Sequence, residues 1–249
     1  DLYCFDQLYR LFCEAADTAE AKGWDVLKEL RAKIEDVYSN WYLSGLSKHW
    51  GEQLEGGGLI NEWKLKGVNP QYEFYKRYVQ PRRNEDQERR VFVIISDAFR
   101  YEAAEELSAE LNGKYRFAAN LTSQLGVLPS YTALGMASLL PHEELAYNEK
   151  GEVIVDGKST SGLAKRQRLL EEVGGTAITS EKLMAMSKSE GREFIKPYRV
   201  IYIYHDQIDQ TADRGNEGKT FQAVRTTIEE LGDLVSKITN NLNGSYILV

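Results

Sequence analysis

One short segment of the sequence combines carboxylates with an imidazole, a set of side chains that can hold a divalent cation. Residues 204–213 contain His205, Asp206, Asp209 and Asp213. Carboxylates this close together repel one another unless a positive group neutralises them. Zinc, manganese and magnesium accept such oxygen and nitrogen ligands, so the segment is a candidate metal site. A solvated acidic loop is the alternative interpretation of the segment taken alone.

Another carboxylate, Asp97, follows the apolar run Val91–Ile95, which is typical of a strand buried on both faces. Residues 200–204 are a second such run, and the acidic segment follows it. Ligands of a parallel sheet bind beyond the carboxyl ends of its strands, so both groups are expected at one edge of the sheet. This placement favours the metal interpretation. Taken alone, Asp97 is better explained as a helix N-cap, and Arg100 as ordinary helix surface.

Two hydroxyl groups, Ser130 and Thr132, lie at the start of an expected helix over residues 131–140. The unpaired backbone N–H groups of a helix N-terminus favour an anion such as phosphate. A hydroxyl close to a metal can be deprotonated into a nucleophile. An N-cap role is the simpler explanation of this segment by itself.

The overall charge argues against a general, charge-driven nucleic-acid binder. The 249 residues carry 31 basic and 38 acidic side chains, a net charge of -7. A local basic cluster is nevertheless present between residues 76 and 90. A solvated linker is the expected explanation of this cluster, and contact with phosphates is the alternative. Its members are Lys76, Arg77, Arg82, Arg83, Arg89 and Arg90.

The cysteine spacing predicts reduced thiols, and the hydropathy pattern predicts no transmembrane helix. Cys4 and Cys13 lie in one helical pattern, and nine helical residues span about 13 Å, too far for a disulfide. No stretch approaches the ~20 apolar residues of a transmembrane helix. We therefore expect reduced thiols, a cytoplasmic location and no membrane partner.

Two patterns divide the chain into a helical N-terminal region over 1–80, a basic linker over 81–90 and an α/β domain over 91–249. Apolar residues in the first region recur at three- and four-residue steps, and its last helix is expected to end before Pro81. After residue 90, strands alternate with helices, which predicts a mostly parallel sheet with helices on both faces. The expected strands are 91–95, 115–119, 177–179, 200–204 and 246–249, and the expected helices are 100–112, 131–140, 161–173 and 217–241.

Three segments in this order, 95–102, 128–142 and 203–209, together closely resemble the PglZ domain. This is the alkaline-phosphatase-like domain of the phage growth limitation and BREX phage-exclusion systems. Residues 5–10 also look like the region that precedes the domain, so the resemblance spans nearly the whole chain. It implies an alkaline-phosphatase-like α/β fold with a two-metal site.

The resemblance also implies roles for individual residues. Asp97 matches the aspartate of the second metal, and Asp209 matches a ligand of the first. Thr132 is similar in position to the nucleophile of related nucleotide phosphodiesterases, with Ser130 the less favoured choice. Asp213 stands where those enzymes carry histidine, and this makes the site richer in oxygen and less typical of zinc.

Three further residues are expected as accessory groups of the site: His205, Asp206 and Arg100. In the family, an Asp-His-Gly segment with further metal ligands follows a strand similar to Tyr246–Val249, and this sequence contains no such segment. We therefore expect an excised piece of a longer protein. The complete protein would bind Zn, Mn or Mg, whereas this chain would hold an incomplete site and show no turnover.

The function that the resemblance implies is a metal-dependent phosphoester hydrolase of a bacterial phage-resistance system, with a threonine nucleophile. A metal-dependent nuclease acting on DNA and a non-catalytic scaffold of the defence complex are the alternatives. The expected partners are a DNA methyltransferase and an ATPase of the same system, with DNA reached through the complex. The aromatic-rich region 1–80 is the candidate docking surface.

Overall fold

The computed structural model describes residues 1–56, 59–85, 89–213 and 219–249. Its central sheet has four strands in the order β7-β8-β2-β9, and all of the neighbouring pairs are parallel. This confirms the predicted α/β class. The strands are β2 (Val91–Ser96), β7 (Gly175–Thr179), β8 (Val200–His205) and β9 (Tyr246–Leu248).

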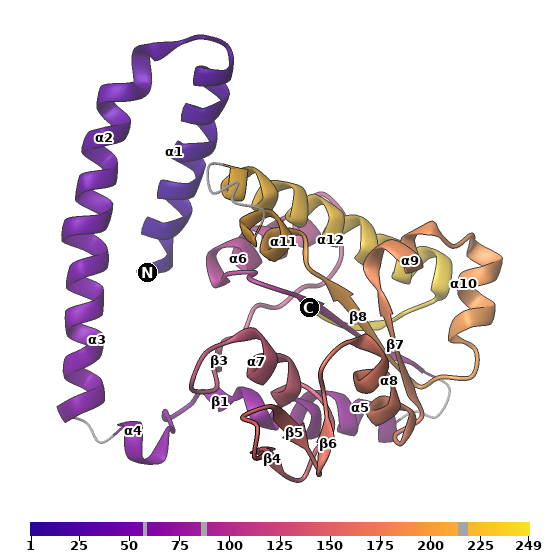
Figure 1. The fold of residues 1–249 in the computed structure, drawn as a ribbon. Helices are drawn as coiled ribbons and strands as arrows, with labels where there is room; N and C mark the ends of the chain where they lie inside the picture. Colours follow the sequence, from indigo (N-terminus) through magenta and orange to yellow (C-terminus); the bar gives the residue numbers. More distant parts are fainter. Residues whose placement is uncertain (57–58, 86–88, 214–218) are drawn as a thin grey trace.

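Helices cover both faces of the sheet, because successive side chains of β2 point to opposite sides and both sides are buried. Val93 and Ile95 pack into one hydrophobic cluster with α7 and α8, and Phe92 and Ile94 pack into the other with α6 and α12. Figure 1 shows α6 and α12 on one side of the sheet and α7 and α8 on the other. The helices are α6 (Tyr101–Gly113), α7 (Thr132–Ser138), α8 (Leu163–Glu171), α9 (Ser180–Ala185), α10 (Lys188–Ile195), α11 (Gln207–Asp213) and α12 (Thr220–Leu242).

Two small sheets flank the central one. A three-stranded antiparallel sheet lies beside α7, and its middle strand contributes Val153 and Val155 to the core. A two-stranded parallel pair joins the N-terminal part of the chain to the segment before α7. The strands are β4 (Leu145–Tyr147), β5 (Val153–Val155) and β6 (Lys158–Ser159), and the pair is β1 (Asn69–Pro70) with β3 (Gln124–Leu125).

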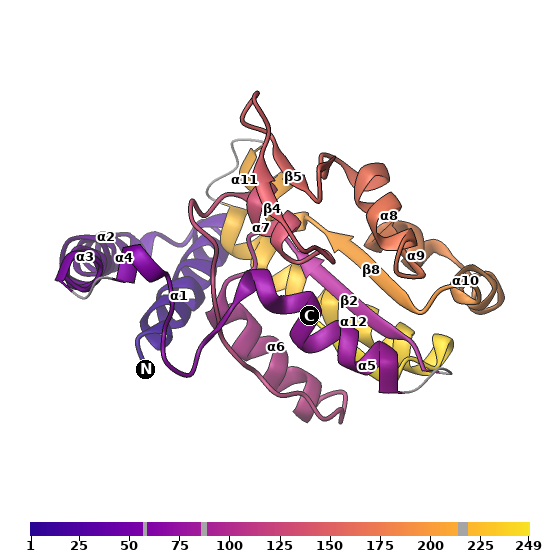
Figure 2. The same ribbon diagram turned by 90° about the horizontal axis from the view of Figure 1, so that it is seen from below.

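The N-terminal residues form a helical arm, here the segment 1–56, which projects from the α/β part of the molecule (Figures 1 and 2). Gly23, with a φ of 78°, allows the chain to reverse between the two sides of the arm. The predicted helical period of this region is thus confirmed. Its elements are α1 (Tyr3–Ala21), a 3-10 turn (Asp25–Leu27), α2 (Lys28–Asp36), a π-helical segment (Val37–Leu43) and α3 (Ser44–Gly56), with α4 (Leu59–Glu62) beyond it.

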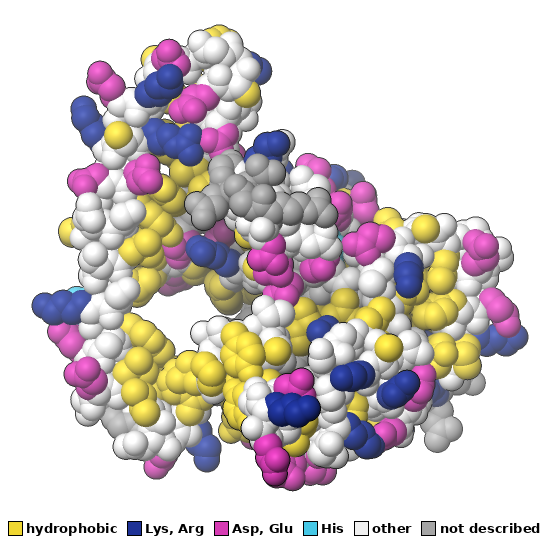
Figure 3. Space-filling view, in the orientation of Figure 1, with side chains coloured by type: hydrophobic (Ala, Val, Ile, Leu, Met, Phe, Trp, Pro, Cys, Tyr) yellow, Lys and Arg dark blue, Asp and Glu magenta, His cyan; other side chains and the backbone are white. Residues whose placement is uncertain are grey.

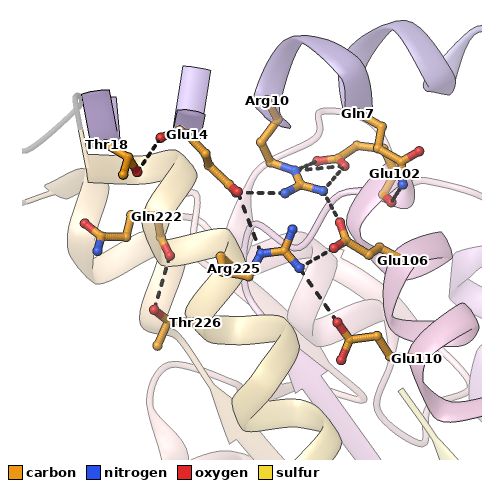
Figure 4. Close-up of polar contacts among 10 residues, drawn as sticks. All are labelled: Gln7, Arg10, Glu14, Thr18, Glu102, Glu106, Glu110, Gln222, Arg225 and Thr226. Carbon is orange, nitrogen blue, oxygen red and sulfur yellow. Dashed lines mark hydrogen bonds and ion pairs between the residues drawn. The ribbon is translucent and has the colours of Figure 1, made fainter. Parts of the chain in front are cut away.

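A buried ion network attaches α1 to α6 and α12 (Figure 4). Nε of Arg10 donates to both carboxylate oxygens of Glu102 at 3.0 Å, and both side chains are buried. Arg225 of α12 pairs with Glu106 and lies 3.7 Å from Glu14 of α1. The helical arm is therefore held on the α/β part by charge pairs as well as by packing.

Two predicted elements differ from the structure. Residues 115–119 do not form a strand, because the side chain of Asn112 bonds both backbone groups of Ala119, at 2.8 and 2.9 Å, in place of a neighbouring strand. The helix expected to end before Pro81 runs on as α5 (Gln80–Glu85). A π-helical segment directly before α5 places the proline in its first turn, where an N–H is not needed.

The division into regions 1–80, 81–90 and 91–249 stays a prediction, and residues 86–88 of the predicted linker lie outside the described residues. Cys4 and Cys13 are both free thiols. Within the part of the chain that the structure describes, no helix has the length and apolar character needed to cross a membrane.

Candidate active site

The register of the two central strands places the predicted site residues side by side. Ser96, the last residue of β2, pairs with His205, the last residue of β8. The backbone N–H of Asp97 then donates to the carbonyl of His205 at 2.8 Å. Asp97 and Asp206 therefore leave the sheet next to each other at its carboxyl edge, as the two apolar runs predicted.

Asp97 does not cap the following helix. The N-cap of α6 is Arg100, and the carboxylate of Asp97 accepts instead from the backbone N–H of Ala98 at 3.0 Å. Ala98 itself has a φ of 59°, an uncommon conformation for a residue with a side chain. The N-cap explanation of Asp97 is thus wrong, and the carboxylate is turned toward the sheet edge by a tight, left-handed residue.

Like charges surround Asp97. Burial raises the pKa of its carboxyl group above the ordinary value, and nearby Asp209 and Asp206 raise it further, while Arg166 acts in the opposite direction. Asp209 is half-buried on α11, close enough to repel Asp97. This mutual repulsion is the electrostatic setting in which a cation is stabilised.

A cavity of about 310 Å³ lies at this edge of the sheet. It brings together four of the predicted residues from three parts of the chain, namely Asp97, Thr132, His205 and Asp206. The other predicted residues do not line it: Asp209, Asp213, Ser130 and Arg100. Of these, Asp213 ends α11 with an exposed side chain, and Ser130 and Arg100 are also exposed.

Thr132 is the first residue of α7, and its side chain is exposed toward this cavity. The N-cap position is occupied by Tyr131, which makes no side-chain cap hydrogen bond. Among the described residues, none forms a hydrogen bond with the hydroxyl of Thr132. The N-cap explanation of Ser130 and Thr132 is therefore wrong, and the hydroxyl of Thr132 is free to engage a ligand.

Both ring nitrogens of His205 are engaged inside the protein. Nδ1 lies 3.0 Å from the hydroxyl of Ser96, and Nε2 lies 2.9 Å from a carboxylate oxygen of Glu230 on α12. The ring is only 4% exposed. This arrangement favours a supporting role for His205, which ties α12 to the ends of β2 and β8, over direct ligation of a metal.

The carboxylates at this edge are the residues that could hold a metal ion. The donor chemistry suits a hard cation, because Asp97, Asp206 and Asp209 are carboxylates that repel one another. Yet within residues 1–56, 59–85, 89–213 and 219–249, no three His, Cys, Asp or Glu side chains are arranged as a ligand set. Any metal site of the described residues would need further ligands.

Sequence reasoning missed six residues that line the same cavity. They are Met136, Arg166, Thr179, Glu181, Tyr204 and Gln210. Tyr204 stands next to His205 at the end of a predicted strand, and that position was the available signal. Arg166 lies on α8, in a helix whose polar positions are typical of a solvated face. Its sequence context carries no signal that separates it from neighbouring surface cations.

The parallel sheet, its helices on both faces and the polar cavity at its carboxyl edge define an alkaline-phosphatase-like α/β protein. The chain belongs to the PglZ family: residues 74–249 match the family described as the BREX system PglZ alkaline phosphatase-like domain.

Two relatives cover essentially the whole chain. It is 49% identical over 252 aligned residues to the alkaline phosphatase-like protein BrxZ of Escherichia coli O9:H4 (strain HS), covering 100% of this chain and 29% of the relative. It is 39% identical to the alkaline phosphatase-like protein PglZ of Bacillus cereus (strain H3081.97), covering 98% of this chain and 28% of the relative. The chain thus spans less than a third of these relatives. No solved structure matches it.

Proposed function

We propose that the full-length protein is a phosphoester hydrolase of a BREX phage-resistance system, with Thr132 as the nucleophile. The observation that carries this proposal is the placement of Thr132, with an unengaged hydroxyl, in one cavity with Asp97 and Asp206. The family description and the names of both relatives, which are alkaline phosphatase-like, support the same reaction class.

The chemistry of the chain's own residues is a displacement at phosphorus. The hydroxyl of Thr132 loses its proton and its oxygen attacks the phosphorus atom of a phosphomonoester; the bond from phosphorus to the ester oxygen breaks, the alcohol leaves with a proton, and a phosphothreonine forms. Water then attacks this phosphorus atom, the bond to the threonine oxygen breaks, the hydroxyl of Thr132 regains a proton, and inorganic phosphate is released. The phosphoryl group would lie against the edge of the sheet where Asp97 and Asp206 follow the strands. The buried Ser96–His205 pair holds the ends of these two strands together.

A divalent metal is part of this proposal for the complete protein. Asp97, Asp209 and Asp213 would contribute carboxylate ligands for Mg, Mn or Zn, together with ligands outside this chain. Such a metal would supply positive charge to offset the carboxylates and to activate the attacking hydroxyl.

Substitution of the nucleophile in the full-length protein tests the proposal. We expect Thr132→Ala and Asp97→Asn each to lower hydrolysis of a chromogenic phosphomonoester or bis-ester by at least about a hundredfold, with Mg, Mn or Zn present. Ser130→Ala, two residues away and outside the cavity, is the matched control and should retain activity. Equal activity of Thr132→Ala and the parent protein would contradict the assignment, and inactivity of the parent with every metal would favour a scaffold.

The basic cluster gives little support to a nuclease. Arg77 pairs with Glu73, Arg82 pairs with Glu85 at 2.8 Å, and Lys76 pairs with Glu143 at 2.7 Å. Arg90 donates to the backbone carbonyls of Ile195, the last residue of α10, and of Lys196 and Tyr198 just after it. These cations are largely used within the protein, so contact with DNA is not needed to explain them.

We further propose that the helical arm contacts other BREX proteins, a methyltransferase or an ATPase, in the cytoplasm. Figure 3 shows hydrophobic side chains along the side of the arm that faces the α/β part across an opening. The exposed aromatic residues of the arm include Trp24 and Trp41, and Trp41 is 67% exposed. Surface aromatics at this density are typical of a protein-binding surface.

A further inference from the structure

Arg166 reaches the candidate active site from α8 and is held there by neutral groups. Its Nε donates to the carbonyl of Thr160 at 3.0 Å, and its Nη1 lies 3.0 Å from the sulfur of Met136 on α7. Its guanidinium carbon lies 4.8 Å from the ring centre of Tyr204, over the aromatic face. Three contacts from three elements therefore fix the plane of the guanidinium.

The positive charge of Arg166 has no carboxylate partner. Among the described residues, none forms an ion pair with this guanidinium, and no hydrogen bond engages its Nη2. Arg10 and Arg225, by contrast, each pair with glutamates. An arginine that is positioned by neutral acceptors, at the wall of a polar cavity, keeps its positive charge and its Nη2 donors for an anion.

The hydroxyl of Tyr204 is a second donor at the same wall, close to the guanidinium of Arg166. Its side chain is more than nine-tenths buried, and its hydroxyl has no hydrogen-bond partner among the described residues. Burial raises the pKa of this hydroxyl to about 12, although the neighbouring guanidinium of Arg166 acts in the opposite direction, so the hydroxyl keeps its proton at neutral pH. A buried donor without a partner is costly, unless a ligand accepts its hydrogen bond.

We propose that Arg166 and Tyr204 bind the non-bridging oxygens of the phosphoryl group, opposite the carboxylates Asp97 and Asp206 in the same cavity. This inference rests on the proposed function, because it names the part of the substrate that the cavity recognises. The N–H groups of Nη2 can donate to oxygens of one phosphate, and the tyrosine hydroxyl can donate to another of its oxygens. Tetrahedral oxyanions such as orthophosphate and vanadate offer the same oxygens.

Orthophosphate binding to the full-length protein tests this inference without requiring turnover. Calorimetric titration is carried out on the parent protein, Arg166→Gln, Arg166→Lys and Tyr204→Phe, once with Mn and once with a chelator. We expect Kd to rise about tenfold to a hundredfold in Arg166→Gln, to rise less in Arg166→Lys, and to rise severalfold in Tyr204→Phe. Arg168→Gln, an exposed arginine on the same helix, is the matched control and should bind as the parent does.

Two results would overturn the inference: no orthophosphate binding by the parent protein, or equal Kd values for the parent, Arg166→Gln and Tyr204→Phe. Because Arg166 is partly buried, thermal unfolding of each variant is measured alongside, and Tyr204→Phe tests the site if Arg166→Gln does not fold. Loss of phosphate binding in Arg166→Gln, combined with an inactive parent, would retain the anion site and reject the hydrolase. If the parent hydrolyses phosphoesters, and phosphate inhibits Arg166→Gln and Tyr204→Phe as strongly as the parent, the hydrolase is retained and the anion site is rejected.

Discussion

The carboxyl group of Asp97 occupies a position that is unfavourable for a charge when no cation is bound. Its pKa is raised above 3.8 by burial, and then by Asp209 and Asp206. The folded protein therefore holds this proton more tightly than the unfolded chain does. As pH rises from 3.8 through the raised pKa, the group lowers the free energy of unfolding.

We accordingly expect Asp97→Asn to stabilise the protein in the presence of a chelator at pH 7, although it lowers activity. The gain in unfolding midpoint should disappear as pH falls below 3.8, where the carboxyl group is neutral in both states. Urea unfolding at several pH values measures this. Glu149→Gln, at an exposed position, is the control. A lower midpoint for Asp97→Asn at pH 7 would show that the charge of Asp97 is already compensated.

At this scale the sequence predicted only part of the site. Asp97 and Thr132 could be found because each follows a recognisable change of pattern, a strand exit or a helix start. The position of Arg166 depends on its contacts with Met136 and Thr160. The hydroxyl of Tyr204 is buried without a hydrogen bond because of how its neighbours pack. Such contacts are set by tertiary packing, which the spacing of residues along one helix does not contain.

Helix α1 is attached to the α/β part through a buried cation. Arg10 is 2% exposed and bonds Glu102, which is 4% exposed. We expect Arg10→Met to lower the free energy of unfolding by about 3–5 kcal/mol, because a buried carboxylate then loses its partner. The double variant Arg10→Met, Glu102→Met should recover much of this loss. Lys28→Met, which breaks only an exposed pair, is the control.

Chemical denaturation with hydrogen exchange on α1 and α6 measures the effect. Exchange should increase in both helices in Arg10→Met and return toward the parent rates in the double variant. If the double variant is as unstable as Arg10→Met, the loss comes from packing of the arginine side chain and not from the unpaired charge.

The turn between α12 and β9 depends on a glycine for close packing. A Cβ atom at Gly244 would lie 2.3 Å from Cγ2 of Ile238 and 2.9 Å from Cε2 of Phe92. We expect Gly244→Ala to cost about 1–3 kcal/mol of stability through overpacking. Gly45→Ala, on α3 with nothing within 4 Å, should instead stabilise the protein by about 0.5–1 kcal/mol. Thermal unfolding of both variants distinguishes these effects, and equal midpoints would contradict the packing argument.

Elements with a strong period were predictable, and elements set by particular side chains were not. The buried strands β2 and β8 and the long helix α12 follow from apolar runs and the 3.6-residue repeat. Residues 115–119 have a strand-like composition, yet Asn112 binds the backbone of Ala119 and no strand forms. In the same way, the continuation of the helix through Pro81 depends on a π-helical segment that composition does not reveal.

At the scale of the whole molecule, the described residues form two hydrophobic clusters, one on each face of the central sheet. Among the described residues, neither cluster contains a residue before Tyr72. The helical arm contacts the α/β part through the Arg10 network and adjacent packing, while much of its aromatic surface stays exposed. The sheet core is therefore complete without the arm.

Deletion of the helical arm, residues 1–56, from the full-length protein should leave the α/β part folded and the proposed phosphoester hydrolysis intact. Glu102 becomes exposed to water when the arm is removed, so it escapes the penalty of a buried unpaired charge, and Arg225 still pairs with Glu106. The same deletion should abolish co-purification with the methyltransferase or ATPase of the system. Circular dichroism measures folding, a phosphoester assay measures hydrolysis, and pull-down measures binding of the partner. Trp41→Ser keeps the helices of the arm and changes only its surface, so this variant separates loss of a binding surface from loss of the helices. A deletion variant that does not fold would make the arm part of the domain, and a folded variant that retains both partners would place the docking surface elsewhere.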